Sequence, residues 1–191
     1  MTDLKDHLAT RRSIAIPALN EPGPTPEQLD RILAMTVRVP DHGKLAPWRF
    51  IVIRDEAARD LGLRMAEIAE AKEGPLSEAR RRFEEDRFTR APLVVAVVST
   101  ARPHFKIPEW EQHLSVGAVT MNLIHACYAE GFATNWITEW VTYDEEAKAA
   151  LGIAPEEKVA GFIYVGTPSE PPVERPRPAL ADVVTYAAPT R

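Results

Sequence analysis

The chain has 191 residues, of which 45% are hydrophobic and 27% charged, so it can bury a core and global disorder is excluded. The formal net charge of −5 argues against nucleic acid or an anionic membrane surface as a general partner. This length predicts a single domain over residues 1–191.

The sequence lacks the usual signals for export, membrane insertion and metal binding. Cys127 is the single cysteine, which excludes an internal disulfide and a cysteine-based metal cage. The five histidines do not have the spacing of metal ligands. No charged-then-apolar leader opens the chain, and no segment approaches about 18 uncharged apolar residues. We therefore expect a cytoplasmic protein without a metal site.

The first quarter of the chain predicts two helices that flank a proline-rich arm. The first helix should end near Thr10 and carry Leu4 and Leu8 on one face, and the arm should cover residues 17–26. The second helix should begin with Thr25 as N-cap and Pro26 at its first position, because Gln28 then completes a capping box.

The middle of the chain predicts strands and amphipathic helices. Residues 48–53 and 92–100 should be strands buried on both faces, since their apolar residues do not alternate with polar ones. Residues 56–88 should form two helices separated at Gly74 and Pro75. Residues 109–130 should form a long helix that is apolar on almost every side, and a second subunit is a natural cover for one of its faces.

The last third predicts two strands, residues 133–138 and 159–165, with a short helix at 144–151 between them. An extended arm with five prolines should follow over residues 168–178. Helices and strands are thus intermixed, and neither proline-rich arm can build a core alone. We expect an α+β fold, with a mixed central sheet wrapped by helices and arms that lie on a neighbouring subunit.

Two basic clusters are candidate anion sites. Arg11, Arg12 and Ser13 follow the first helix, while Arg175 and Arg177 emerge from a segment that prolines stiffen. Guanidinium groups bind phosphate oxygens in pairs, and a serine hydroxyl adds one more donor. Taken alone, each cluster also fits a solvated helix end or a solvated basic tail.

Two polar segments are candidate walls of a ligand site. Arg38, Asp41, His42 and Lys44 lie between a helix and an apolar strand, where a plain polar loop is the alternative. Residues 135–138 (Asn-Trp-Ile-Thr) end a strand after the long helix, and core packing of Trp136 is the alternative there.

Together, four segments give the chain a resemblance to the FMN-dependent nitroreductase family, and to its compact, YdjA-like branch in particular. These segments are residues 11–13, 39–50, 161–168 and 175–177, and they follow the order that the family shows. The resemblance implies a nitroreductase-like fold, with the flavin at the interface of a homodimer and with arms exchanged between the two subunits.

The resemblance also implies the cofactors and the site residues. NAD(P)H would deliver hydride to flavin N5, and a nitroaromatic, a quinone or a related small molecule would then accept it, without any side chain as general acid or nucleophile. We expect the cofactor site to involve Arg11, Arg12, Ser13, Arg38, His42, Lys44, Trp136, Ile137, Thr138, Arg175 and Arg177. The family pattern is broken at residues 41, 42, 44 and 46, and a basic residue two positions after Ser13 is replaced by Ala15.

Other function classes fit less well. No Gly-x-Gly-x-x-Gly follows a strand, and neither a P-loop lysine motif nor a Gly-x-Ser-x-Gly elbow is present. The main alternative is a non-catalytic, flavin-binding or flavin-handling protein of the same fold. A protein-interaction module without cofactor is a second alternative, which would give Arg11 and Arg177 no role.

Overall fold

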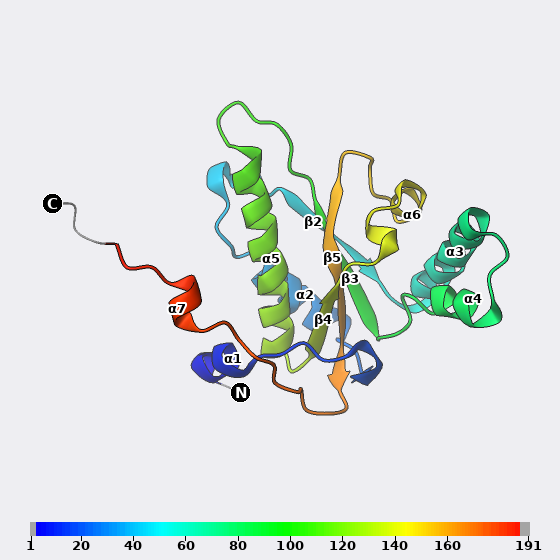
Figure 1. Cartoon of the computed structure of the whole chain (residues 1–191), viewed down its shortest axis with the longest axis horizontal. Coiled ribbons are helices and arrows are strands. Elements are labelled where there is room, and N and C mark those ends of the chain that lie inside the picture. The colour runs from blue at the N-terminus through cyan, green and yellow to red at the C-terminus, as the bar shows by residue number, and fades with distance from the viewer. Residues whose placement is uncertain (1–2, 188–191) are drawn as a thin grey trace.

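The computed structural model of the chain describes residues 3–187. A five-stranded sheet forms its centre (Figure 1), built from β1 (Leu19–Asn20), β2 (Trp48–Ile53), β3 (Leu93–Ser99), β4 (Ala133–Ile137) and β5 (Lys158–Pro168). The strand order is β1-β5-β3-β2, and β4 also pairs with β5. All four pairings are antiparallel. The α+β class is confirmed, and the parallel pairing of a mixed sheet is not found within residues 3–187.

The helices cover both faces of this sheet. They are α1 (Leu4–Thr10), α2 (Pro26–Thr36), α3 (Asp55–Glu73), α4 (Glu78–Glu85), α5 (Glu109–Ala129), α6 (Glu145–Ala150) and α7 (Leu180–Val183). Three short 3-10 helices are η1 (Ile16–Ala18), η2 (His42–Lys44) and η3 (Trp140–Thr142). The capping box of α2 is confirmed, because the Thr25 hydroxyl accepts the Gln28 N–H and the Gln28 side chain accepts the Thr25 N–H. The expected break between α3 and α4 is confirmed as well.

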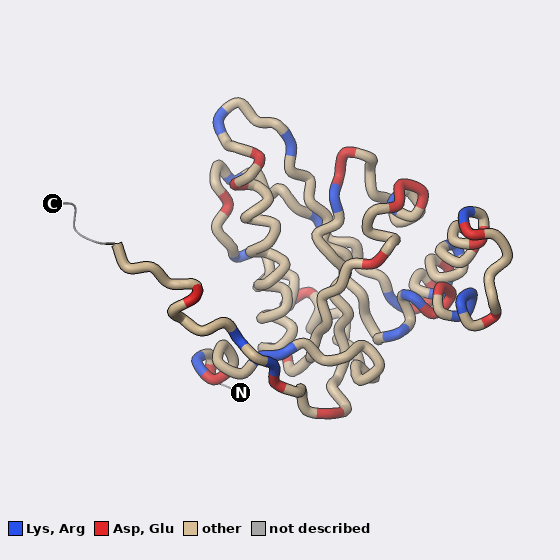
Figure 2. The backbone as a smooth tube through the Cα atoms, viewed as in Figure 1, with Lys and Arg blue, Asp and Glu red and all other residues tan. Residues whose placement is uncertain are grey.

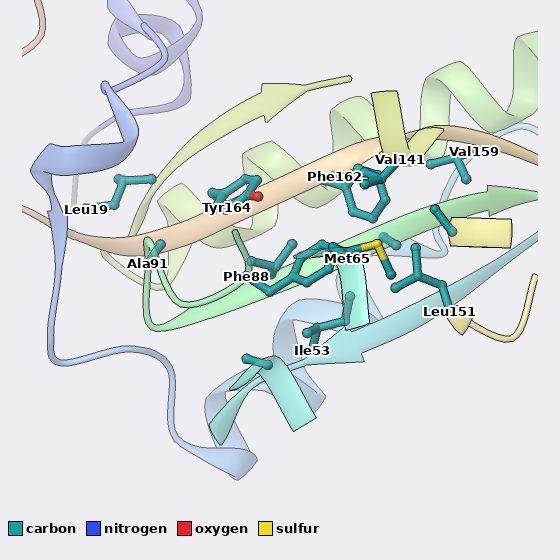
Figure 3. Packing of buried hydrophobic residues seen from close by; sticks show 14 of the residues in the cluster. Leu19, Ile53, Met65, Phe88, Ala91, Val141, Leu151, Val159, Phe162 and Tyr164 are labelled. Carbon is teal, nitrogen blue, oxygen red and sulfur yellow. The ribbon is translucent and has the colours of Figure 1, made fainter. Parts of the chain in front are cut away.

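Alternating residues of the central strand β3 supply two separate cores. Val94, Ala96 and Val98 face the core that includes Met65 of α3, Phe88, Phe162 and Tyr164 (Figure 3). The other apolar residues of the strand, Leu93, Val95 and Val97, face the core formed with α2 and α5. The expectation that this strand is buried on both faces is therefore confirmed.

The expectation of full burial is wrong for β2. This strand lies at the end of the sheet order, so only one of its edges is paired, and Val52 is 38% exposed. The apolar composition of β2 indicates that both of its faces are partly covered, but it does not indicate that β2 is an edge strand of the sheet.

The long helix α5 is covered by its own chain more fully than its composition suggests. Six of its apolar residues are buried: Val116, Val119, Leu123, Ile124, Ala126 and Cys127. The remaining apolar side chains gather on one face, where Trp110 is 69% and Leu114 is 54% exposed. A Cβ atom added to Gly117 would meet no other atom within 4 Å. One stripe of α5, rather than several faces, is therefore open.

A buried ion pair joins α4 to the segment before β3. Glu84 and Arg87 are 0% and 1% exposed, and the guanidinium donates from Nε to Glu84 Oε2 and from Nη2 to Glu84 Oε1, each at 2.6 Å. Arg80 also pairs with Glu84, and the indole of Trp140 donates to it at 3.1 Å. The charge of the buried carboxylate is therefore fully compensated.

The C-terminal arm packs on little of its own chain. Every residue from 168 to 187 is exposed, and the segment with α7 runs away from the body of the molecule (Figure 1). Its apolar side chains are among the most exposed of the described residues, with Tyr186 at 91% and Val173 at 83%. The N-terminal helix α1 likewise buries none of its residues, and Leu4 and Leu8 are both more than half exposed.

Candidate functional site

The basic segment at residues 11–13 follows directly on the last turn of α1. The Arg11 N–H donates to the carbonyl of His7, and Arg11 itself adopts an extended conformation, so the helix ends there. The hydroxyl of Tyr128, on α5, donates to the carbonyl oxygen of Arg12 and ties this segment to the fold. Arg11 and Arg12 are half-buried, and Ser13 is exposed.

The structure brings the second basic cluster to the same place. After β5 the chain turns back, and Arg12 Nε donates to the carbonyl oxygen of Val173 at 3.0 Å. Glu174 lies between the two clusters, since its Oε1 is 3.6 Å from Arg12 Nε and 3.4 Å from Arg177 Nη2. Figure 2 shows basic residues from both ends of the chain meeting beside α1. Two segments separated by 160 residues of sequence thus form one surface.

A cavity of about 480 Å³ opens beside these arginines. Arg11 and Arg12 line it, together with Tyr128 and the first residues of the C-terminal arm. Guanidinium groups next to an open cavity provide directional donors for an anion. This end of α5 is therefore a candidate phosphate site.

A histidine pair supports α1 at the edge of this cavity. His7 Nε2 and His125 Nδ1 are 2.8 Å apart, and the two rings pack edge to face. Burial lowers the pKa of both imidazoles, and the nearby Arg11 guanidinium lowers each further. Sequence reasoning missed this pair, because the two residues are 118 positions apart and have no motif in common.

The loop at residues 41–46 has a strained backbone. Gly43, Lys44 and Ala46 have φ values of 77°, 56° and 44°, in the left-handed region that residues with a side chain rarely adopt. The carboxylate of Asp41 holds this shape by accepting the N–H groups of Leu45 at 3.1 Å and Ala46 at 2.8 Å. Such strain persists only where the surroundings fix it, and it gathers at functional sites.

The side chains of this loop present positive charge to solvent. His42 Nδ1 lies 2.5 Å from Glu111 Oε2 near the start of α5, so the imidazole is held by its Nδ1. Lys44 and Arg38 are exposed. Two exposed cations therefore lie on or next to this loop.

The two halves of the expected site lie at opposite ends of α5 within one chain (Figure 1). Glu111 marks the end that holds His42, and Tyr128 marks the end that holds Arg12. Because the two are 17 residues apart in a helix, about 25 Å separates them along its axis. A single chain does not bring Arg38, His42 and Lys44 together with Arg11, Arg12 and Arg177.

The segment at residues 136–138 ends β4. The Trp136 indole N–H donates to the carbonyl oxygen of Ala160 at 3.1 Å, and its ring lies against Gly161, where any Cβ would come within 2.1 Å of it. Ile137 points to the opposite face of the sheet and packs against the core that contains Phe162. Thr138 is exposed. The side chains of Trp136 and Ile137 therefore face different sides.

Other kinds of site find less support in residues 3–187. No group of three or more His, Cys, Asp or Glu side chains in this part of the chain could hold a metal ion. Among the described helices, none has the length and apolar character needed to cross a membrane. Burial raises the pKa of the Cys127 thiol to about 12, so this thiol is poorly nucleophilic.

Comparisons with known proteins agree on one family. The sequence model of the Nitroreductase family matches residues 8–167. YdjA of Escherichia coli strain K12, whose name marks it as a candidate NAD(P)H nitroreductase, is 36% identical over 168 residues, which cover 87% of this chain and 88% of that protein.

Solved structures agree on the fold. A nitroreductase-like family protein from Bacillus cereus has a TM-score of 0.82 at 18% identity, and the match covers 98% of this chain and 97% of that one. A structure from Exiguobacterium sibiricum, described as a candidate nitroreductase in complex with FMN, has a TM-score of 0.74 at 17% identity and covers 98% of both chains.

Proposed function

Because the chain belongs to the nitroreductase family, we propose that it is an FMN-dependent oxidoreductase that uses NAD(P)H to reduce a small oxidised acceptor. We propose nitroaromatic compounds and quinones as the class of acceptor. When bound, FMN would supply the redox chemistry, which is the transfer of a hydride equivalent from NAD(P)H to the acceptor. The roles left to the side chains are binding, orientation and charge stabilisation.

The residues at the end of α1 fit the phosphate of FMN. Arg11 and Arg12 line the cavity of about 480 Å³, and Arg177 lies near Arg12 through their shared contact with Glu174. In this proposal Arg175 and the Ser13 hydroxyl add further donors. A terminal phosphate carries close to two negative charges and accepts several hydrogen bonds, which this donor set can supply. In the proposed complex these residues fix the phosphate end of the cofactor.

The loop at residues 38–44 fits the flavin ring. Arg38 and Lys44 present positive charge beside the His42 imidazole, and Asp41 holds the backbone of residues 45 and 46 in place. Reduction of a flavin places negative charge along its pyrimidine edge, and a nearby cation stabilises that charge. The backbone amides at residues 136–138 would lie along the ring, which does not require the side chains of Trp136 and Ile137 to face the same side.

A homodimer would unite the two halves of this site. The open stripe of α5 contains Trp110, Leu114 and Gly117, and Gly117 lies near the middle of the helix. Two copies packed antiparallel about a two-fold axis near Gly117 would place the His42 loop of one subunit beside the Arg12 end of its partner. The opposite ends of α5 in one chain then become neighbours in the assembly.

The exposed arms fit the same assembly. Val173, Leu180 and Tyr186 expose most of their apolar surface in a single chain. Burial of these side chains on the partner would add to an interface that, for an obligate dimer, covers about 2,000 Å² or more. Arms exchanged between subunits are therefore part of the proposal.

The main support for this proposal is that the basic segments at residues 11–13 and 175–177 meet beside one cavity in a chain of this family. The test is the absorption spectrum of freshly purified protein, followed by heat release and chromatography of the pigment. We expect non-covalent FMN rather than FAD, and oxidation of NAD(P)H when a quinone is added. A colourless protein that does not take up FMN would contradict the proposal, and a yellow protein that oxidises neither NADH nor NADPH would indicate a flavin-binding role.

A further inference from the structure

Glu174 occupies the centre of the surface that the phosphate would use. Its Oε1 atom is 3.6 Å from Arg12 Nε and 3.4 Å from Arg177 Nη2. These are two of the arginines that the proposed function assigns to the FMN phosphate. A carboxylate of the chain itself thus stands where the anionic end of the cofactor would bind.

The backbone around Glu174 is held by the same groups. Arg12 Nε, on a side chain that is only 18% exposed, donates to the carbonyl oxygen of Val173 at 3.0 Å. The N–H of Arg175 donates to Glu174 Oε1 at 2.7 Å. This N–H lowers the pKa of the Glu174 carboxyl, and Arg177 and Arg12 lower it further, so the side chain is an anion at neutral pH. Arg12 therefore fastens the C-terminal arm to the end of α1.

A phosphate at this place would meet the negative charge of Glu174. Two like charges within a few ångströms of each other repel, and Glu174 already neutralises part of the positive charge of Arg12 and Arg177. Either the phosphate binds weakly beside Glu174, or the Glu174 carboxylate moves away.

We propose that Glu174 is an internal competitor for the FMN phosphate, so that cofactor binding displaces its carboxylate from between Arg12 and Arg177. The inference rests on the proposed function and adds a residue that sets the affinity of the same site. The two arginines that face Glu174 in the cofactor-free chain are then available to the phosphate.

The test compares the affinity of Glu174→Gln and wild-type protein for FMN and for riboflavin, which lacks the phosphate. The measurement is quenching of flavin fluorescence on titration of cofactor-free protein. Glu156→Gln, an exposed glutamate in the turn before β5, is the matched control for the change in net charge. Removal of two exposed ion-pair contacts should tighten FMN binding about three- to tenfold. Riboflavin binding should not change, and the control should leave both affinities as in wild type.

Three results would overturn the inference. They are unchanged or weaker FMN binding by Glu174→Gln, equal tightening for FMN and riboflavin, and equal tightening by Glu156→Gln. If wild type and Glu174→Gln both fail to bind FMN, the proposed function is wrong. The competition between Glu174 and an anion is then tested separately, by comparing the affinity of the two proteins for inorganic phosphate. Tighter phosphate binding by Glu174→Gln would support competition at the arginines, whereas equal binding would refute it.

Discussion

A heterodimer made from two defective subunits tests whether the cofactor site is shared between chains. Arg11→Ala removes a cation that lines the proposed phosphate end, and Lys44→Glu reverses the charge of the loop at the other end of α5. If each site takes its phosphate end from one subunit and its loop from the partner, each homodimer has two defective sites. The mixed dimer then has one site with both defects and one site that is intact.

The size of the effect follows from the contacts. A charge-assisted hydrogen bond contributes roughly 1.5–3 kcal/mol. Because Arg11 is only half-buried in the single chain, we take the lower end of that range. This corresponds to about a tenfold weaker affinity for FMN. Lys44→Glu should cost at least as much, since it places a carboxylate against an electron-rich edge of the flavin ring.

The assay is fluorescence titration of FMN into dimers that carry a different affinity tag on each subunit, so that only mixed dimers are isolated. We expect half of the sites to bind with wild-type affinity and the other half to bind more weakly than in either homodimer. Two equivalent sites, each with a single defect, would show that one chain builds the whole site. That result would refute the assignment of the loop to the partner.

Three further outcomes follow from other parts of the structure. If the proposed dimer forms along α5, Gly117→Arg should convert it to monomer in sedimentation at micromolar concentration and should abolish FMN binding with it. A monomer that retains one FMN per chain would contradict the proposed shared site. Glu84→Gln removes the buried carboxylate that pairs with Arg87 and Arg80, while Glu139 still pairs with Arg87. This change should cost about 3 kcal/mol of unfolding free energy in urea titration, and a loss below about 1 kcal/mol would show that Glu139 alone compensates the charge of Arg87. Because the pKa values of His7 and His125 are lowered by folding, the unfolded chain binds more protons. Stability should therefore fall as pH drops below about 6.5, and His7→Gln should flatten that dependence.

The parts of the fold that local chemistry decides could be predicted from the sequence. The capping box at Thr25 is a contact within four residues, and the apolar composition of β3 leaves no face for solvent. The edge position of β2 could not be predicted, because it depends on which strands pair rather than on the strand itself. The open face of α5 could not be predicted either, because its other faces are buried by α2 and by sheet strands that are distant in sequence.

The candidate site shows the same division. The basic clusters at Arg12 and Arg177 could be identified by residue type, and the structure places them together. Glu174 was missed, although an acidic residue within a basic stretch was a visible signal. The separation of His42 from Arg12 could not be foreseen, because it follows from the length and direction of α5 and not from either motif.

The strained loop also has a consequence for how this protein can evolve. Ala46 lies at a φ of 44°, where glycine would be free of strain. Selection for thermal stability alone would therefore favour Ala46→Gly, provided that the strain energy relieved in the folded state exceeds the entropic cost of a more flexible unfolded chain. Selection for a rigid loop at that position would oppose the same change. Retention of alanine under both pressures would mark residue 46 as a place where adaptation to heat and adaptation to function compete.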